Sequence, residues 1–205
     1  MAALASHDPT SGFSEAAQEL DLFAGGPAGL LVVPGDSVDE LMLWRTLLER
    51  MESLGFSGLL SGAPGAVEFL RSLGVERVCV VAAGARAEHA LHLAAEEQVD
   101  ALILISPRIR CGVAADLLRS LRIPRLLVAG SDPRDVDAVR QLDAQSFGNV
   151  ALRFFPSPDA GHRLLDGEVG PLVGETVSLF AGRVLGLGNA PTTQQSGSAL
   201  EEVMP

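Results

Sequence analysis

The feature that most constrains the fold of this chain is the alternation of apolar runs with segments of helical periodicity. Runs rich in apolar residues are typical of strands buried on both faces of a sheet, and they occur at 30–33, 77–81, 101–105, 125–129 and 150–155. Helices are predicted at 38–54, 66–73, 86–96, 113–121, 135–144 and 170–185. Strands that alternate with helices predict an α/β fold, a doubly wound and mostly parallel sheet with helices on both faces.

Two further strands are predicted in the first third of the chain. Glu19 to Phe23 alternates polar and apolar residues, which is typical of a half-exposed edge strand. Residues 56–60 form a second, short apolar run.

The first long helix has a clear N-terminal signal. Ser37, followed three residues later by Glu40, is a capping-box pattern, in which each side chain accepts a hydrogen bond from the backbone amide of the other residue. The buried face is predicted from apolar residues at helical spacing: Leu41, Trp44, Leu47, Leu48 and Met51. Trp44 is therefore expected in the core rather than at a ligand site.

Length and charge limit the organisation and the partners of this protein. The chain of 205 residues suffices for one domain, predicted at 17–187 between a flexible N-terminal segment (1–16) and a mobile tail (188–205). A net charge of −11 disfavours nucleic acids and anionic membranes, because both would repel the surface. Neither a signal peptide nor a membrane-spanning run is evident, so we expect a soluble, cytoplasmic protein.

Residues that form disulfides or bind metals are few. Cys79 and Cys111 do not make a disulfide framework, and both are expected to be reduced, Cys79 as a core residue. His89 and His92 are three residues apart on a predicted helix and can share a face, but no third metal ligand has a clear place. We therefore predict no metal and no cofactor.

In open α/β sheets ligands bind at the carboxyl ends of the strands, so four loops are candidates for the site: 34–37, 82–86, 130–135 and 156–163. The segments around them resemble the α/β-hydrolase family, in particular its small, lidless, dienelactone-hydrolase-like members. The matching stretches are Val78–Ala94, Val99–Pro107, Ile123–Asp132 and Ala160–Leu165. Their order makes the resemblance specific, and it covers roughly residues 20–185. It implies an α/β-hydrolase-like sheet without a lid domain.

The chain departs from this family where the nucleophile is expected. The family's elbow reads G-x-S-x-G and holds a serine on a strained strand-to-helix turn. Laid over this sequence, the elbow covers residues 82–86, so the nucleophile position falls on Gly84 and the second glycine on Arg86. Acyl transfer through a covalent intermediate requires a hydroxyl or thiol, and Gly84 supplies neither.

The histidine and acid loops of the family are retained. His162 aligns with the family histidine, and it is either a preserved general base or a relic that fills a loop. Asp132 aligns with the acid, and Asp135 is a nearby substitute. The alternative role for Asp132 is turn and helix-cap chemistry, because Ser-Asp-Pro is a strong turn sequence.

Three functions are consistent with this pattern. The first is a relative without serine-hydrolase activity that binds a small ligand or a protein partner, with a pocket formed by Pro34, Gly35, Gly84, Ala85 and Arg86. The second is a hydrolase of small esters or lactones in which Asp132 and His162 activate water. The third is a structural subunit of an assembly, to which the apolar tail residues Leu200, Val203 and Met204 contribute. An arginine side chain that fills the cavity over Gly84 would disfavour both a ligand and a substrate.

Overall fold

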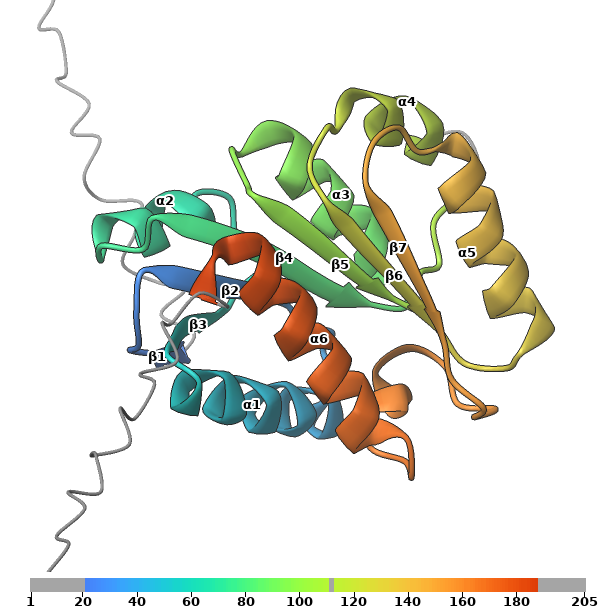
Figure 1. Cartoon of the computed structure of the whole chain (residues 1–205), viewed down its shortest axis with the longest axis horizontal. Helices are drawn as coiled ribbons and strands as arrows, with labels where there is room; N and C mark the ends of the chain where they lie inside the picture. The colour runs from blue at the N-terminus through green and yellow to red at the C-terminus, as the bar shows by residue number, and fades with distance from the viewer. Residues whose placement is uncertain (1–20, 111–112, 188–205) are drawn as a thin grey trace, which may run out of the picture.

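A computed structural model describes residues 21–110 and 113–187, which form a single seven-stranded sheet with helices on both faces (Figure 1). The strands are β1 (Leu22–Phe23), β2 (Ala28–Val33), β3 (Phe56–Leu60), β4 (Arg77–Ala83), β5 (Ala101–Ile105), β6 (Arg125–Ala129) and β7 (Val150–Phe154). The predicted N-terminal segment, the predicted tail and Cys111 lie outside the described residues.

The helices follow the strands in alternation. They are α1 (Val38–Ser53), α2 (Ala66–Ser72), α3 (Arg86–Glu96), α4 (Val113–Ser120), α5 (Pro133–Gln145), the 3-10 helix η1 (Gly161–Leu165) and α6 (Gly170–Leu185). Within the described part of the chain the elements succeed one another without an inserted lid. None of the helices described there has the length and apolarity needed to span a bilayer.

The strand order is β1-β3-β2-β4-β5-β6-β7, and every pairing is parallel except that of β1 with β3. From β2 the chain first adds β3 on one side and then crosses to add β4 on the other. The order therefore reverses between β2 and β4, and such a switch point opens a crevice at the carboxyl ends of the strands. The predicted doubly wound, mostly parallel α/β sheet is confirmed.

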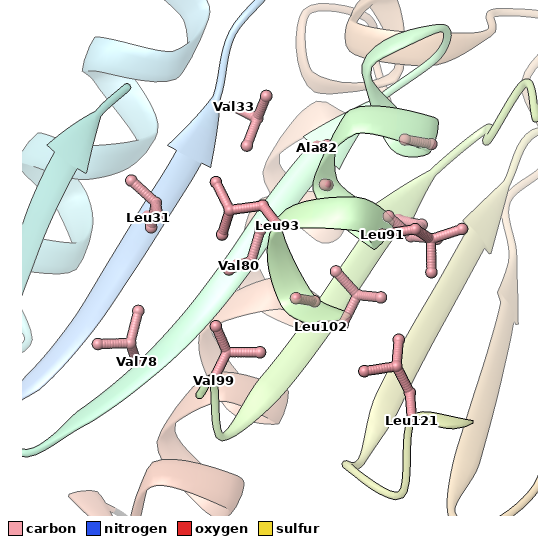
Figure 2. Packing of buried hydrophobic residues seen from close by; sticks show 14 of the residues in the cluster. Leu31, Val33, Val78, Val80, Ala82, Leu91, Leu93, Val99, Leu102 and Leu121 are labelled. Carbon is pink, nitrogen blue, oxygen red and sulfur yellow. The ribbon is translucent and has the colours of Figure 1, made fainter. Parts of the chain in front are cut away.

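Two apolar layers cover the sheet, one on each face. Alternate strand residues such as Leu31, Val80 and Leu102 point toward α2 to α5, where Leu91 of α3 packs among them (Figure 2). The intervening strand residues point toward α1 and α6, which lie side by side on the opposite face (Figure 1). Trp44 is fully buried in this second layer, as the helical spacing predicted.

The boundaries differ from the sequence predictions at a few ends. Only Leu22 and Phe23 of the expected edge strand pair with β3 in the described residues. Strand β4 continues to Ala83, two residues beyond its predicted end, and so carries the chain directly into the turn at Gly84. Helix η1 was not predicted, because its five residues are too few to show a helical period.

Candidate functional site

A cleft with a volume of about 680 Å³ lies at the carboxyl ends of β2 and β4, at the switch point of the sheet. Its walls come from the loop after β2, the turn after β4, the segment after β5 and the segment that enters η1. The lining residues are Gly35, Asp36, Glu40, Ala83, Gly84, Ala85, Arg86, Arg108, Pro158, Asp159, Ala160, Gly161, His162 and Arg163. Of the predicted pocket residues, Pro34 is not in this set and the other four are.

Gly84 occupies a sharp turn between β4 and α3. Its φ is +55°, a left-handed conformation that side chains other than glycine adopt at a cost. Its amide donates to the Ile105 carbonyl at 2.9 Å, and its own carbonyl accepts from the Arg108 amide at 2.9 Å. A Cβ at this position would have Gly161 Cα, at 3.9 Å, as its nearest neighbour, so the turn has room for a side chain. The backbone of a nucleophile elbow is thus present without its nucleophile.

None of the described residues that line the cleft carries a hydroxyl or a thiol. Ser106 lies beyond the end of β5, beside the Gly84 turn in the sheet, with a φ of +43°. Its side chain is fully buried, its hydroxyl has no hydrogen-bond partner, and it does not line the cleft. Cys79 is also fully buried, and burial, with a smaller effect of the Asp100 charge, raises the pKa of its thiol. Neither residue places a hydroxyl or a thiol in the cleft in this arrangement.

Arg86, the first residue of α3, leaves the cleft open. Its Nη2 lies 2.6 Å from Oδ1 of Asp36, so its side chain reaches toward the loop after β2. The guanidinium group therefore lies in an ion pair at the wall of a cleft that retains its volume. Arg86 therefore does not fill the cavity over Gly84, an arrangement that would have disfavoured both a ligand and a substrate.

His162, in η1, faces a carboxylate from α1. Its Nδ1 lies 3.2 Å from Oε2 of Glu40, and only 9% of the Glu40 side chain is exposed. The other carboxylate oxygen, Oε1, accepts from the Gly35 amide at 3.0 Å and from Trp44 Nε1 at 3.1 Å. Only half of the predicted capping box forms, because the Glu40 amide donates to Ser37 while the Glu40 side chain turns to Gly35.

Asp132 lies apart from this contact, contrary to the expected Asp132–His162 pair. It is the N-cap of α5, and its Oδ1 accepts from the Arg134 amide at 2.8 Å. Pro133 begins the helix immediately after it, which fixes the carboxylate over the first turn. Asp135 is buried with Oδ2 unpartnered, and it does not line the cleft either. In the described residues the carboxylate beside His162 is Glu40, which the sequence presented only as a capping residue.

Other candidate residues of the sequence have structural contacts. The ring Nε2 of His89 lies 2.7 Å from the Gly62 carbonyl oxygen, so this ring bonds to the loop after β3. Arg108 and Arg163 were not singled out by the sequence, yet both line the cleft and are exposed. Among the described residues no carboxylate pairs with either guanidinium group. Exposed arginines occur throughout the chain, so only the fold distinguishes these two.

The strand order, the elbow turn after β4 and a histidine loop at the carboxyl edge of the sheet together define the α/β-hydrolase fold. Solved structures agree. A dienelactone hydrolase from Anabaena variabilis superposes with a TM-score of 0.64 at 18% identity, over 78% of this chain and 88% of that one. Est1E from Butyrivibrio proteoclasticus superposes with a TM-score of 0.63 at 16% identity, over 79% of this chain and 89% of that one.

Similarity beyond the fold is low. A structure from work on the metagenome-derived lipolytic enzymes LipS and LipT gives a TM-score of 0.65 at only 11% identity, over 80% of this chain and 97% of that one. No protein-family model matches the chain, and no curated protein sequence matches it. This chain has the α/β-hydrolase fold, which it shares with the dienelactone hydrolase from Anabaena variabilis.

Proposed function

We propose that this protein binds a small anionic ligand in the cleft above Gly84 and has lost serine-hydrolase activity. The observation that carries the proposal is the open cleft of about 680 Å³ whose described lining holds no hydroxyl or thiol. Covalent acyl transfer has no starting atom at Gly84, whereas a cleft of this volume is within the range of small-molecule sites.

The loop after β2 supports the loss of acyl transfer. The Gly35 amide, a backbone donor in the cleft wall, already donates to Glu40 at 3.0 Å. A tetrahedral oxyanion needs free donors aimed at it, and a neighbouring carboxylate would repel it. The Glu40 carboxylate is therefore unfavourable for an oxyanion at this wall.

Two arginines of the cleft support an anionic ligand, although Asp36, Glu40 and Asp159 line it as well. Arg108 and Arg163 supply two exposed guanidinium groups without carboxylate partners among the described residues. Ala85 precedes α3, so the positive end of that helix dipole faces the same cleft. Guanidinium forks match a carboxylate or a phosphate. Among the structural neighbours, Est1E has been solved with ferulic acid, a carboxylic acid, which makes ferulate a suitable probe.

The first experiment treats the native protein and its Gly84→Ser variant with a fluorophosphonate and with methyl ferulate. We expect the native protein to be neither labelled nor hydrolytic. We expect the variant to be labelled, because the turn has room for the side chain and His162 lines the same cleft. The serine must adopt a φ near +55°, so the variant should be roughly 1–2 kcal/mol less stable. A covalent adduct on the native protein would overturn the proposal.

A second candidate function rests on the contact between His162 and Glu40. A histidine held by a buried carboxylate can activate water, which would hydrolyse a small ester without a covalent intermediate. This candidate requires that the native protein hydrolyse methyl ferulate and that His162→Ala abolish the hydrolysis. Activity that survives His162→Ala would exclude it.

A further inference from the structure

Glu40 is a nearly buried carboxylate with a complete set of neighbours. Its side chain is 9% exposed, and each of its oxygens has a separate environment. Oε1 accepts two hydrogen bonds, from the Gly35 amide and from the Trp44 indole. Oε2 has the Nδ1 of His162 at 3.2 Å. A buried carboxylate is stabilised by donors to its lone pairs, and a proton on Nδ1 would make His162 such a donor to Oε2.

We propose that Glu40 is the positioning residue for His162 and fixes the neutral ring in the tautomer that carries its proton on Nδ1. A neutral imidazole has one N–H and one lone pair, so a proton on Nδ1 leaves the lone pair on Nε2. His162 lines the cleft with 31% of its side chain exposed. Nε2 is then a hydrogen-bond acceptor for a hydroxyl group of the bound molecule or for water.

The local sequence is adapted to this placement of the carboxylate. A Cβ on Gly35 would collide with Glu40 Oε2, so a larger residue there would force the carboxylate to shift from its place beside His162. Ser37 accepts from the Glu40 amide at 3.2 Å and thereby anchors the first turn of α1. Trp44, one turn further along α1, donates a hydrogen bond from Nε1 to Oε1 of Glu40.

The other charged groups of the cleft have different contacts. Asp36 pairs with Arg86 at 2.6 Å. Asp159 accepts from the Ser157 hydroxyl at 2.8 Å. Arg86, Arg108 and Arg163 also line the cleft but cannot accept a proton from the ring. Among the described residues, Glu40 thus supplies the carboxylate within ion-pair distance of His162. Its effect on the ring proton does not depend on whether the protein hydrolyses esters.

The test is the ¹⁵N NMR signature of the His162 ring in native full-length protein. The spectra are recorded at a pH at which the ring is neutral. The His162 resonances are assigned by their loss in His162→Gln. We expect a protonated Nδ1 and an unprotonated Nε2. Glu40→Gln should invert this pattern. Its amide oxygen must stay with the two donors at Gly35 and Trp44, so its NH₂ group faces Nδ1 and moves the ring proton to Nε2.

Asp132→Asn is the matched control, because it makes the same chemical change at the carboxylate that aligns with the family acid. It should leave the ring pattern unchanged. A native ring protonated on Nε2 overturns the proposal without any variant, and this measurement does not depend on how Glu40→Gln folds. An unchanged pattern in folded Glu40→Gln, or an inversion in Asp132→Asn, overturns it as well.

Discussion

The carboxylate of Glu40 contacts three groups: a backbone amide, an indole and a histidine ring. The sequence signal at this residue was a helix-capping pattern, and the structure keeps the Ser37 half of that pattern. The side chain itself turns toward the preceding loop, because Gly35 lacks a Cβ and offers an amide donor there. A local motif predicted the helix start correctly and did not show the long-range contact.

Asp132 has a structural role at the start of α5. Its carboxylate caps α5, so Asp132→Ala should lower the free energy of unfolding by about 1 kcal/mol, the usual effect of removing an N-cap. Urea denaturation measures this change, with exposed Asp137 of α5 substituted by alanine as the control. In the Gly84→Ser background, Asp132→Ala should leave fluorophosphonate labelling unchanged. A large loss of labelling would instead assign Asp132 to the site.

Between elements, the site depends on two backbone turns that approach each other closely. Gly84 joins β4 to α3, and Gly161 begins η1 with a φ of +62°. A Cβ on Gly161 would lie 3.7 Å from Gly84 Cα. This approach brings the histidine helix over the elbow, and it explains how η1 places His162 in the cleft although α3 and η1 are far apart in sequence.

A second junction of elements lies around Arg125, at the start of β6. The residue is fully buried, and it donates to the Leu118 carbonyl of α4 at 3.0 Å and to the Phe147 carbonyl after α5. Burial, and to a smaller extent the charge of Arg122, lower the pKa of this guanidinium. Its cation satisfies carbonyl groups at the ends of two helices, where the helix dipole favours positive charge.

Arg125→Ala should therefore lower the free energy of unfolding by about 2–4 kcal/mol, because two carbonyls lose their donor and a cavity replaces the side chain. Urea denaturation is the measurement, and Arg140→Ala, at an exposed position of α5, is the control. A variant as stable as the native protein would show that desolvation of the buried charge cancels these hydrogen bonds.

For the whole molecule, charge is distributed unevenly. The chain carries a net charge of −11, yet Arg86, Arg108 and Arg163 gather around one cleft. The same cleft is lined by Asp36, Glu40 and Asp159, and Asp36 pairs with Arg86, so Arg108 and Arg163 are the guanidinium groups left to attract an anion. The proposed anionic ligand would therefore depend on Arg108 and Arg163.

Arg108→Ala and Arg163→Ala should each weaken the binding of ferulate about 2- to 5-fold, since an exposed ion pair contributes up to about 1 kcal/mol. Added salt should weaken native binding in the same direction. NMR titration measures both effects, and Arg183→Ala on α6 is the control. Equal binding of ferulate and methyl ferulate would contradict an anionic ligand.

The pattern of apolar runs and helical periods decided the α/β class and nearly every element, because these depend on neighbours along the chain. Residues 82–86, aligned with the family motif, were enough to locate the turn at Gly84. The identity of the carboxylate beside His162 was decided only by the tertiary structure. Glu40 and His162 are far apart in sequence, and their contact arises from the packing of η1 against α1. Asp132, which aligns with the family acid, instead caps its own helix, because the backbone amide of Arg134 lies within reach of its side chain.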